Sequence, residues 1–241
     1  MSAEIQSPIV RVYVWQIPVR ITHWLIALSI VVLSATGFYI GHPFITVTGE
    51  ARAHFVMGWV RVVHGYTAYV FIAAVLTRII WMFTGNKYAR WDKFIPVHRS
   101  RQHGLWPTIR FYLFMLRKPP GFVGHNPVAG LTYVAVFGLY FLAIFTGLTM
   151  RGASAAPGAP VHIFASLAPV FGGLQTARWI HHAVMWLLLG FAVHHVYSAL
   201  LMSTIEANAT VESIFSGYKF VPEEDLKYSG YRFINRGEVD E

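Results

Sequence analysis

The sequence of 241 residues contains no cysteine. The chain therefore cannot form disulfides, thiolate-bound zinc sites or cysteine-held iron–sulfur sites, and it lacks the C-x-x-C-H motif that attaches c-type haem covalently. Charged residues are also scarce, at 12% against roughly one quarter in an ordinary globular domain. Hydrophobic residues make up 55%, and the mean hydropathy is +0.49. This composition favours a chain that lies in a lipid bilayer.

Four apolar segments are long enough to cross a bilayer as helices, which takes about 20 residues each. They are residues 21–41, 62–84, 130–150 and 180–203, and none contains Asp or Glu. The first is too long for the apolar core of a secretory signal and no small-residue cleavage site follows it, so we expect it to be retained. The fold class expected is an all-α membrane protein, a bundle of four transmembrane helices.

The basic residues predict how this bundle is oriented. The connector between the second and third segments holds eight of them, whereas the loops after the first and third segments hold four. Because loops rich in Lys and Arg face the cytoplasm, we expect the connector and both termini there. Such an orientation also explains the formal net charge of +8, and nucleic acid is not expected as a partner. The eight are Lys87, Arg90, Lys93, Arg99, Arg101, Arg110, Arg117 and Lys118, and the four are Arg52, Arg61, Arg151 and Arg178.

The segments between and after the spans have distinct characters. Residues 104–118 combine aromatic and aliphatic side chains with flanking basic ones, which predicts an amphipathic helix at the cytoplasmic interface between helices 2 and 3. Residues 151–178 are rich in Gly, Ala and Pro and predict a compact outer cap. The chain turns polar near residue 206, so we expect a membrane domain over 1–205 and a soluble or partly disordered cytoplasmic tail over 206–241.

Two histidines on the fourth segment, His181 and His195, are fourteen residues apart. In a helix this spacing returns to within about 40° of the same face after a rise of about 21 Å. One face of the helix therefore carries an imidazole near each side of the membrane. Such an arrangement suits two stacked haems, each held axially by histidine.

The expected topology gives each of these histidines a partner at its own depth. His64 begins the second span on the outer side, the level of His181, and His23 begins the first span on the inner side, the level of His195. A single interfacial histidine is more often a polar anchor or a packing residue, but ionisable residues at membrane depth are rare and usually functional. Four histidines in two layers favour the ligand interpretation.

The remaining histidines are weaker candidates. His182 and His194 adjoin the two ligand candidates but do not share one face with each other or with them across the helix, since their spacings rotate by about 120° to 140°. They are open to roles in hydrogen bonding or helix packing. Solvated surface positions are expected for the six in loops, which are His42, His54, His98, His103, His125 and His162.

Arg78 interrupts the apolar second span, fourteen residues after His64. Its guanidinium suits a propionate of the inner haem as a bidentate partner, although snorkelling to the cytoplasmic headgroups explains it as well. The glycines Gly37, Gly138, Gly147 and Gly190 allow either a macrocycle or a neighbouring helix to approach the backbone closely. The sequence leaves both pairs of alternatives open.

Two motifs connect these residues to a known family. Arg20 opens R-x-x-H-W, which contains His23 and is followed by the T-G of SATGFYIG, and the fourth segment reads H-x(4)-W-x(4)-F-x(3)-H from His181 to His195. Further similar stretches are MGWVRVVHG, LTRIIWMFTGNKYARW and GHNPVAG. With these motifs, the chain is similar over most of its length to the cytochrome b subunit of membrane-bound nickel-iron uptake hydrogenases.

The resemblance implies two non-covalent b-type haems with bis-histidine ligation, one between His64 and His181 and the other between His23 and His195. It also implies a place in the bacterial inner membrane, an outer partner made of nickel-iron large and small hydrogenase subunits, and electron transfer from dihydrogen oxidation to quinone. Such a subunit carries no hydrogenase active site of its own. The doublets His181–His182 and His194–His195 leave the ligand in each uncertain by one residue.

Three alternatives remain at this stage. The haem subunit of a formate dehydrogenase, or a related quinone-reactive cytochrome b, uses similar chemistry. A histidine-lined metal-ion transporter is disfavoured, because its ligands are expected near the midplane together with carboxylates. A pure anchor without cofactor is the third.

Overall fold

The computed structural model describes residues 8–44, 55–117 and 119–228. Arg52, His54 and Lys118 lie outside the described residues. The described part contains four helices long and apolar enough to cross a membrane, α1 (Ile17–Gly41), α2 (Val56–Thr84), α4 (Pro127–Ala153) and α5 (Leu174–Glu206). They confirm the four predicted segments, and each begins three to six residues earlier than its apolar run. Helices satisfy their own backbone groups, as a hydrocarbon environment demands.

The shorter elements connect these helices or flank them. They are β1 (Ile9–Tyr13), the 3₁₀ helix η1 (Trp91–Lys93), α3 (Arg99–Tyr112), the 3₁₀ helix η2 (Pro160–Phe171), α6 (Thr210–Ser216), β2 (Tyr218–Pro222) and α7 (Glu223–Tyr228). The helix expected at 104–118 is present as α3 but lies five to six residues earlier. Its contact with the lipid interface stays a prediction. The loop expected to form a cap contains η2.

The chain divides into two compact units. The first, here called the terminal unit, comprises residues 1–21, 78–136 and 194–241. The second, the central unit, comprises residues 22–77 and 137–193. Each of the four long helices contributes to both.

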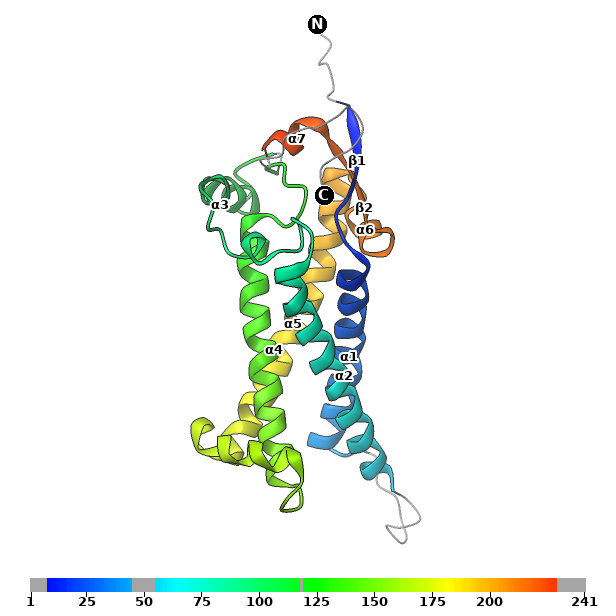
Figure 1. The fold of residues 1–241 in the computed structure, drawn as a ribbon, viewed down its shortest axis with the longest axis vertical. Helices are drawn as coiled ribbons and strands as arrows, with labels where there is room; N and C mark the ends of the chain where they lie inside the picture. Colours follow the sequence, from blue (N-terminus) through cyan, green and yellow to red (C-terminus); the bar gives the residue numbers. More distant parts are fainter. Residues whose placement is uncertain (1–7, 45–54, 118, 229–241) are drawn as a thin grey trace, which may run out of the picture. The chain divides into compact units, whose positions relative to one another are not determined.

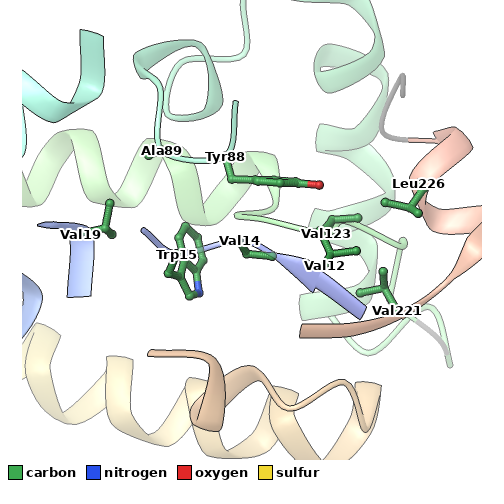
Figure 2. Close-up of a cluster of buried hydrophobic side chains, with 9 residues drawn as sticks. All are labelled: Val12, Val14, Trp15, Val19, Tyr88, Ala89, Val123, Val221 and Leu226. Carbon is green, nitrogen blue, oxygen red and sulfur yellow. The ribbon is translucent and has the colours of Figure 1, made fainter. Parts of the chain in front are cut away.

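A cluster of apolar side chains forms the core of the terminal unit. It is drawn in Figure 2, and its members are Val12, Val14, Trp15, Val19, Tyr88, Ala89, Val123, Val221 and Leu226. These residues come from both ends of the chain and from the connector after α2. Strand β1 pairs with β2 in antiparallel register, with Arg11 opposite Phe220, and the two strands lie side by side in Figure 1. Part of the predicted polar tail is thus paired with the start of the chain, and the domain border at 205 stays a prediction.

Gly217 makes the junction between α6 and β2. Its φ of +91° is a left-handed conformation, and a Cβ there would lie 2.8 Å from the carbonyl oxygen of Trp15. Its own carbonyl accepts hydrogen bonds from the backbone N–H groups of Val14 and Trp15, at 2.8 and 3.0 Å. Only glycine fits both the angle and the close approach.

The start of α4 explains part of the GHNPVAG stretch. Pro127 is the first helical residue, where a missing N–H costs nothing. The side-chain oxygen of Asn126 accepts a hydrogen bond from the backbone N–H of Ala129 at 2.8 Å. A Cβ at Gly130 would lie 2.7 Å from the carbonyl oxygen of Lys93. The connector backbone therefore packs directly on this first turn of α4.

Candidate functional site

Three of the four predicted ligand histidines belong to the central unit, among them the pair predicted for the outer level, His64 on α2 and His181 on α5; the third is His23 on α1. The structure therefore places in one compact unit the pair that the sequence placed at one depth. Both side chains are partly buried.

The imidazole of His64 is hydrogen-bonded to the preceding helix. Its Nδ1 lies 2.8 Å from the hydroxyl oxygen of Thr36 on α1. That hydroxyl donates its only proton to backbone carbonyls of its own helix, those of Val32 at 2.7 Å and Leu33 at 3.2 Å. Because the proton is used there, the Thr36 oxygen accepts a hydrogen bond from His64 Nδ1–H.

His181 repeats this arrangement with another helix pair. Its Nδ1 lies 3.0 Å from the hydroxyl oxygen of Thr146 on α4. The hydroxyl of Thr146, which is fully buried, donates to the carbonyls of Leu142 at 2.6 Å and Ala143 at 3.1 Å. The oxygen is again placed to accept a hydrogen bond from Nδ1–H, and the backbone carbonyl of Ala143 is a second acceptor for the His181 ring.

These contacts favour the tautomer that carries the proton on Nδ1 in both histidines, which leaves a lone pair on Nε2. A neutral imidazole in this tautomer binds a metal through Nε2, while its Nδ1–H is held by an outer partner. Thr36 and Thr146 act as this partner for His64 and His181. Both side chains therefore meet this requirement for binding a metal through Nε2.

A glycine follows each of these threonines and lies next to the same imidazole. A Cβ at Gly37 would be 3.7 Å from Cε1 of His64, and a Cβ at Gly147 would be 3.2 Å from Cε1 of His181. At Gly138 and Gly190, by contrast, a Cβ would meet no atom within 4 Å. Contact with a neighbouring helix therefore does not account for the latter two, and open space borders both.

His182 differs from its neighbour. Its Nδ1–H donates to the backbone carbonyl of Arg178 at 2.8 Å, and its Nε2 would lie 3.2 Å from a Cβ at Gly41. It is thus bonded within its own helix and directed at the end of α1, whereas His181 is directed at the Thr146–Gly147 pair. This geometry favours His181 in the first doublet.

The second predicted pair is divided between the units, since His23 belongs to the central unit and His195 to the terminal unit. Their pairing stays a prediction. In the terminal unit, Nδ1 of His195 lies 3.4 Å from the hydroxyl of Tyr133 on α4. His194 instead has its Nε2 3.3 Å from the hydroxyl of Ser198 on its own helix. In the central unit the His23 ring packs edge-on against Trp24.

Arg78, also in the terminal unit, is only 7% exposed. Its two terminal nitrogens lie 3.4 Å from the carbonyl oxygen of Ala89, a long distance for a hydrogen bond. Its guanidinium carbon lies 5.3 Å from the ring centroid of Phe94. The side chain is thus directed at the connector and buried rather than extended into water, which disfavours snorkelling.

The comparisons with known proteins agree with this geometry. The family described as prokaryotic cytochrome b561 matches residues 14–217. The chain belongs to this family. Among relatives, a protein of Azotobacter chroococcum is 35% identical over 217 residues, covering 88% of this chain and 90% of its own length. Proteins of Cupriavidus necator and Escherichia coli are 38% and 36% identical, covering 86% and 88% of this chain and 86% and 92% of their own lengths.

The relatives from Azotobacter and Cupriavidus are named probable Ni/Fe-hydrogenase B-type cytochrome subunit, and that of Escherichia coli probable Ni/Fe-hydrogenase 1 B-type cytochrome subunit. The resemblance drawn from the motifs is thereby confirmed. Membership of the cytochrome b561 family implies haem b. The residues of the central unit fit this group, because two imidazoles there present Nε2 lone pairs.

Sequence reasoning missed several residues of this cytochrome b561 family member. The roles of Thr36 and Thr146 carried no signal, since a helical threonine ordinarily bonds its own backbone. His125 was expected on a solvated surface, but its Nδ1 is buried and its ring packs 4.7 Å from Tyr133 and 4.8 Å from Trp15, between centroids. That expectation was wrong for His125.

Proposed function

We propose that this chain is the b-type cytochrome subunit of a nickel-iron hydrogenase, which it anchors to the membrane. It conducts electrons from dihydrogen oxidation to quinone. Two non-covalent haem b groups are held by histidine pairs, His64 with His181 on the outer side and His23 with His195 on the inner side. The hydrogenase large and small subunits dock on the outer face.

The observation that carries the proposal is the matched pair of hydrogen bonds at His64 and His181. Each imidazole donates Nδ1–H to a threonine on the preceding long helix, and each keeps Nε2 for a metal. A helix-packing or anchoring histidine has no need of this tautomer, let alone twice in one unit. The names of the relatives add the haem type and the hydrogenase partner.

Haem b with two histidine ligands has no open coordination position, so it supplies one-electron transfer rather than substrate activation. The residues of the chain then have three tasks. The four histidines hold the metal, the two threonines orient the outer pair, and the buried guanidinium of Arg78 offers a bidentate partner to a propionate at the inner site.

The orientation proposed is a multi-pass protein of the bacterial inner membrane with both termini in the cytoplasm. It rests on the excess of Lys and Arg in the connector after α2. In this orientation the loop with η2 faces the hydrogenase, and α3 lies at the cytoplasmic interface. Trp106, at 62% exposed, and Phe114, at 94% exposed, then meet lipid headgroups.

A haem subunit of formate dehydrogenase remains the nearest alternative in chemistry. The printed names of the relatives favour a hydrogenase. Co-purification with an enzyme that oxidises dihydrogen decides between these two. A metal-ion transporter or a cofactor-free anchor has no b-type haem bands in the dithionite-reduced minus oxidised spectrum.

Alanine substitution of His64 or His181 tests the proposal. In the membrane-bound complex we expect either variant to lose one of two haems and to lose quinone reduction by dihydrogen, whereas reduction of an artificial dye by the hydrogenase continues. His182→Ala is the matched control and should keep both haems. Two haems and full quinone reduction in the His64→Ala and His181→Ala variants would refute the ligand assignment.

A further inference from the structure

The same dipeptide, Thr-Gly, stands beside two histidines of the central unit, His64 and His181. Thr36-Gly37 on α1 faces His64 on α2, and Thr146-Gly147 on α4 faces His181 on α5. The two helix pairs are far apart in the sequence, yet threonine, glycine and imidazole recur in the same relation. In both, the histidine belongs to the long helix that follows the Thr-Gly helix.

We infer that Thr36 and Thr146 are positioning residues that fix the ligand tautomer of His64 and His181 and lower the redox potential of the haem between them. The inference rests on the proposed function and extends it from the ligands to the residues that tune them. Neither threonine touches the metal, because each acts through the Nδ1–H of its histidine.

The direction of the effect follows from the hydrogen bond. A threonine oxygen that accepts Nδ1–H draws the proton away from the ring and makes Nε2 a stronger donor. A stronger donor stabilises ferric iron more than ferrous iron, so the potential falls. Both hydroxyls lie within hydrogen-bond distance of carbonyls of their own helix, which favours donation of their proton there and leaves their oxygen to accept Nδ1–H.

Gly37 and Gly147 have a separate, steric role beside His64 and His181. They leave room for the imidazole to lie against the helix that bonds it, most tightly at Gly147, where the space to Cε1 is 3.2 Å. A side chain there pushes the ring away from the position in which Nδ1 reaches Thr146. The dipeptide thus combines an acceptor with the space that lets the imidazole approach it.

Valine and serine substitutions separate this role from ordinary packing. Thr36→Val and Thr146→Val keep the shape of the side chain but remove the hydroxyl oxygen that accepts the hydrogen bond. Thr36→Ser and Thr146→Ser keep this hydroxyl. Thr149→Val is the matched control, because Thr149 is also fully buried on α4 and its hydroxyl donates to the carbonyl of Phe145 at 2.7 Å, while no imidazole in the described part of the chain is bonded to it. Each variant is studied in the complete hydrogenase complex by potentiometric titration of the haem bands and by low-temperature EPR.

We expect each valine variant to raise the potential of one haem, changing its ferrous-to-ferric ratio by about tenfold, or about 59 mV for one electron. The other haem, the serine variants and Thr149→Val should keep wild-type values. Loss of the outer haem in a valine variant but not in its serine counterpart supports the inference as well.

Two results overturn it. One is an unchanged potential in both valine variants while His64→Ala removes the haem, which leaves the proposed function intact. The other is an equal shift or equal loss in the valine and serine variants, which indicates packing alone. A wild-type complex without b-type haem contradicts the proposed function itself, and this inference with it.

Discussion

At the scale of single residues, the glycines beside the long helices differ in the room they leave. A Cβ at Gly147 would meet His181 Cε1 at 3.2 Å, whereas a Cβ at Gly138 on the same helix would meet nothing within 4 Å. The first position is therefore tight against a proposed ligand and the second is open on the protein side.

Gly147→Ala should therefore displace the His181 ring by a few tenths of an ångström, which we expect to lower the occupancy of the outer haem or alter its EPR signal. Gly138→Ala is the comparison at a position where no described protein atom lies within 4 Å of the added Cβ, and in both variants alanine raises the helix propensity by about 1 kcal/mol. The haem content and low-spin EPR signals of both purified variants check this. Wild-type haem content and EPR signals in Gly147→Ala would contradict the predicted displacement of the His181 ring.

We expect His125 to make the stability of the terminal unit depend on pH. Burial lowers its pKa well below the ordinary 6.5, and the neighbouring charges of Arg78, Lys219, Arg101 and His195 lower it further. The unfolded chain binds a proton at this residue near pH 6.5, and the folded chain does so only at lower pH. Stability therefore rises with pH across this interval and is lost as the pH falls through it.

From this we expect the free energy of unfolding in detergent to decrease from pH 7 to pH 5, with a share from His125 of at most about 1.4 kcal/mol per pH unit. His125→Gln should flatten the profile. Tryptophan fluorescence follows the transition, because Trp15 packs against the His125 ring. Identical pH profiles for the two proteins would refute the role of His125.

The residues accessible to sequence reasoning were those whose type is unusual in their surroundings. Histidines and Arg78 stand out in apolar helices. The fourteen-residue spacings from His181 to His195 and from His64 to Arg78 place each pair near one helix face. Threonine does not stand out, because its own backbone satisfies it. His125 was misjudged because a loop position says nothing about which side chains fold over it.

At the scale of elements, the pairing of β1 with β2 is the part of the terminal unit most open to test. Adjacent residues of β2 face opposite sides, since Val221 is 2% exposed in the apolar cluster and Phe220 is 47% exposed. The same substitution at these two positions therefore probes the buried and the exposed face of one strand.

Val221→Asp should destabilise the terminal unit by about 2–5 kcal/mol, because it buries a carboxylate in place of an apolar side chain. Phe220→Asp should cost much less, as its side chain reaches solvent or a lipid headgroup. Thermal unfolding in detergent, followed by tryptophan fluorescence, measures the difference. Equal midpoints for the two variants would contradict the observed register.

The elements differ in how well a sequence predicts them. Runs of twenty or more apolar residues specify α1, α2, α4 and α5, because a bilayer admits few other structures. Five-residue strands formed by the two ends of a chain leave no comparable pattern. Helix α3 begins at Arg99, before the predicted 104–118, and contains Pro107 in its interior; its first turn is polar and basic, so it lacks the apolar pattern on which that prediction was based.

At the scale of the whole molecule, the four long helices belong to a multi-pass membrane protein whose family is established. We propose in addition that it conducts electrons through haems held at two levels of the membrane. The central claim of this proposal is that each chain holds two haems between histidine pairs. The proposed ligand role of His64 and His181 is supported by their hydrogen bonds to threonines, and that of His23 and His195 rests on the sequence pattern.

Counting the haems in the purified wild-type complex, by pyridine haemochrome with low-temperature EPR, tests this claim most directly. The account predicts two b-type haems per chain, both low-spin with bis-histidine signals and reducible by dihydrogen through the hydrogenase. A colourless subunit, a single haem per chain, or iron signals from ligands other than histidine would contradict it.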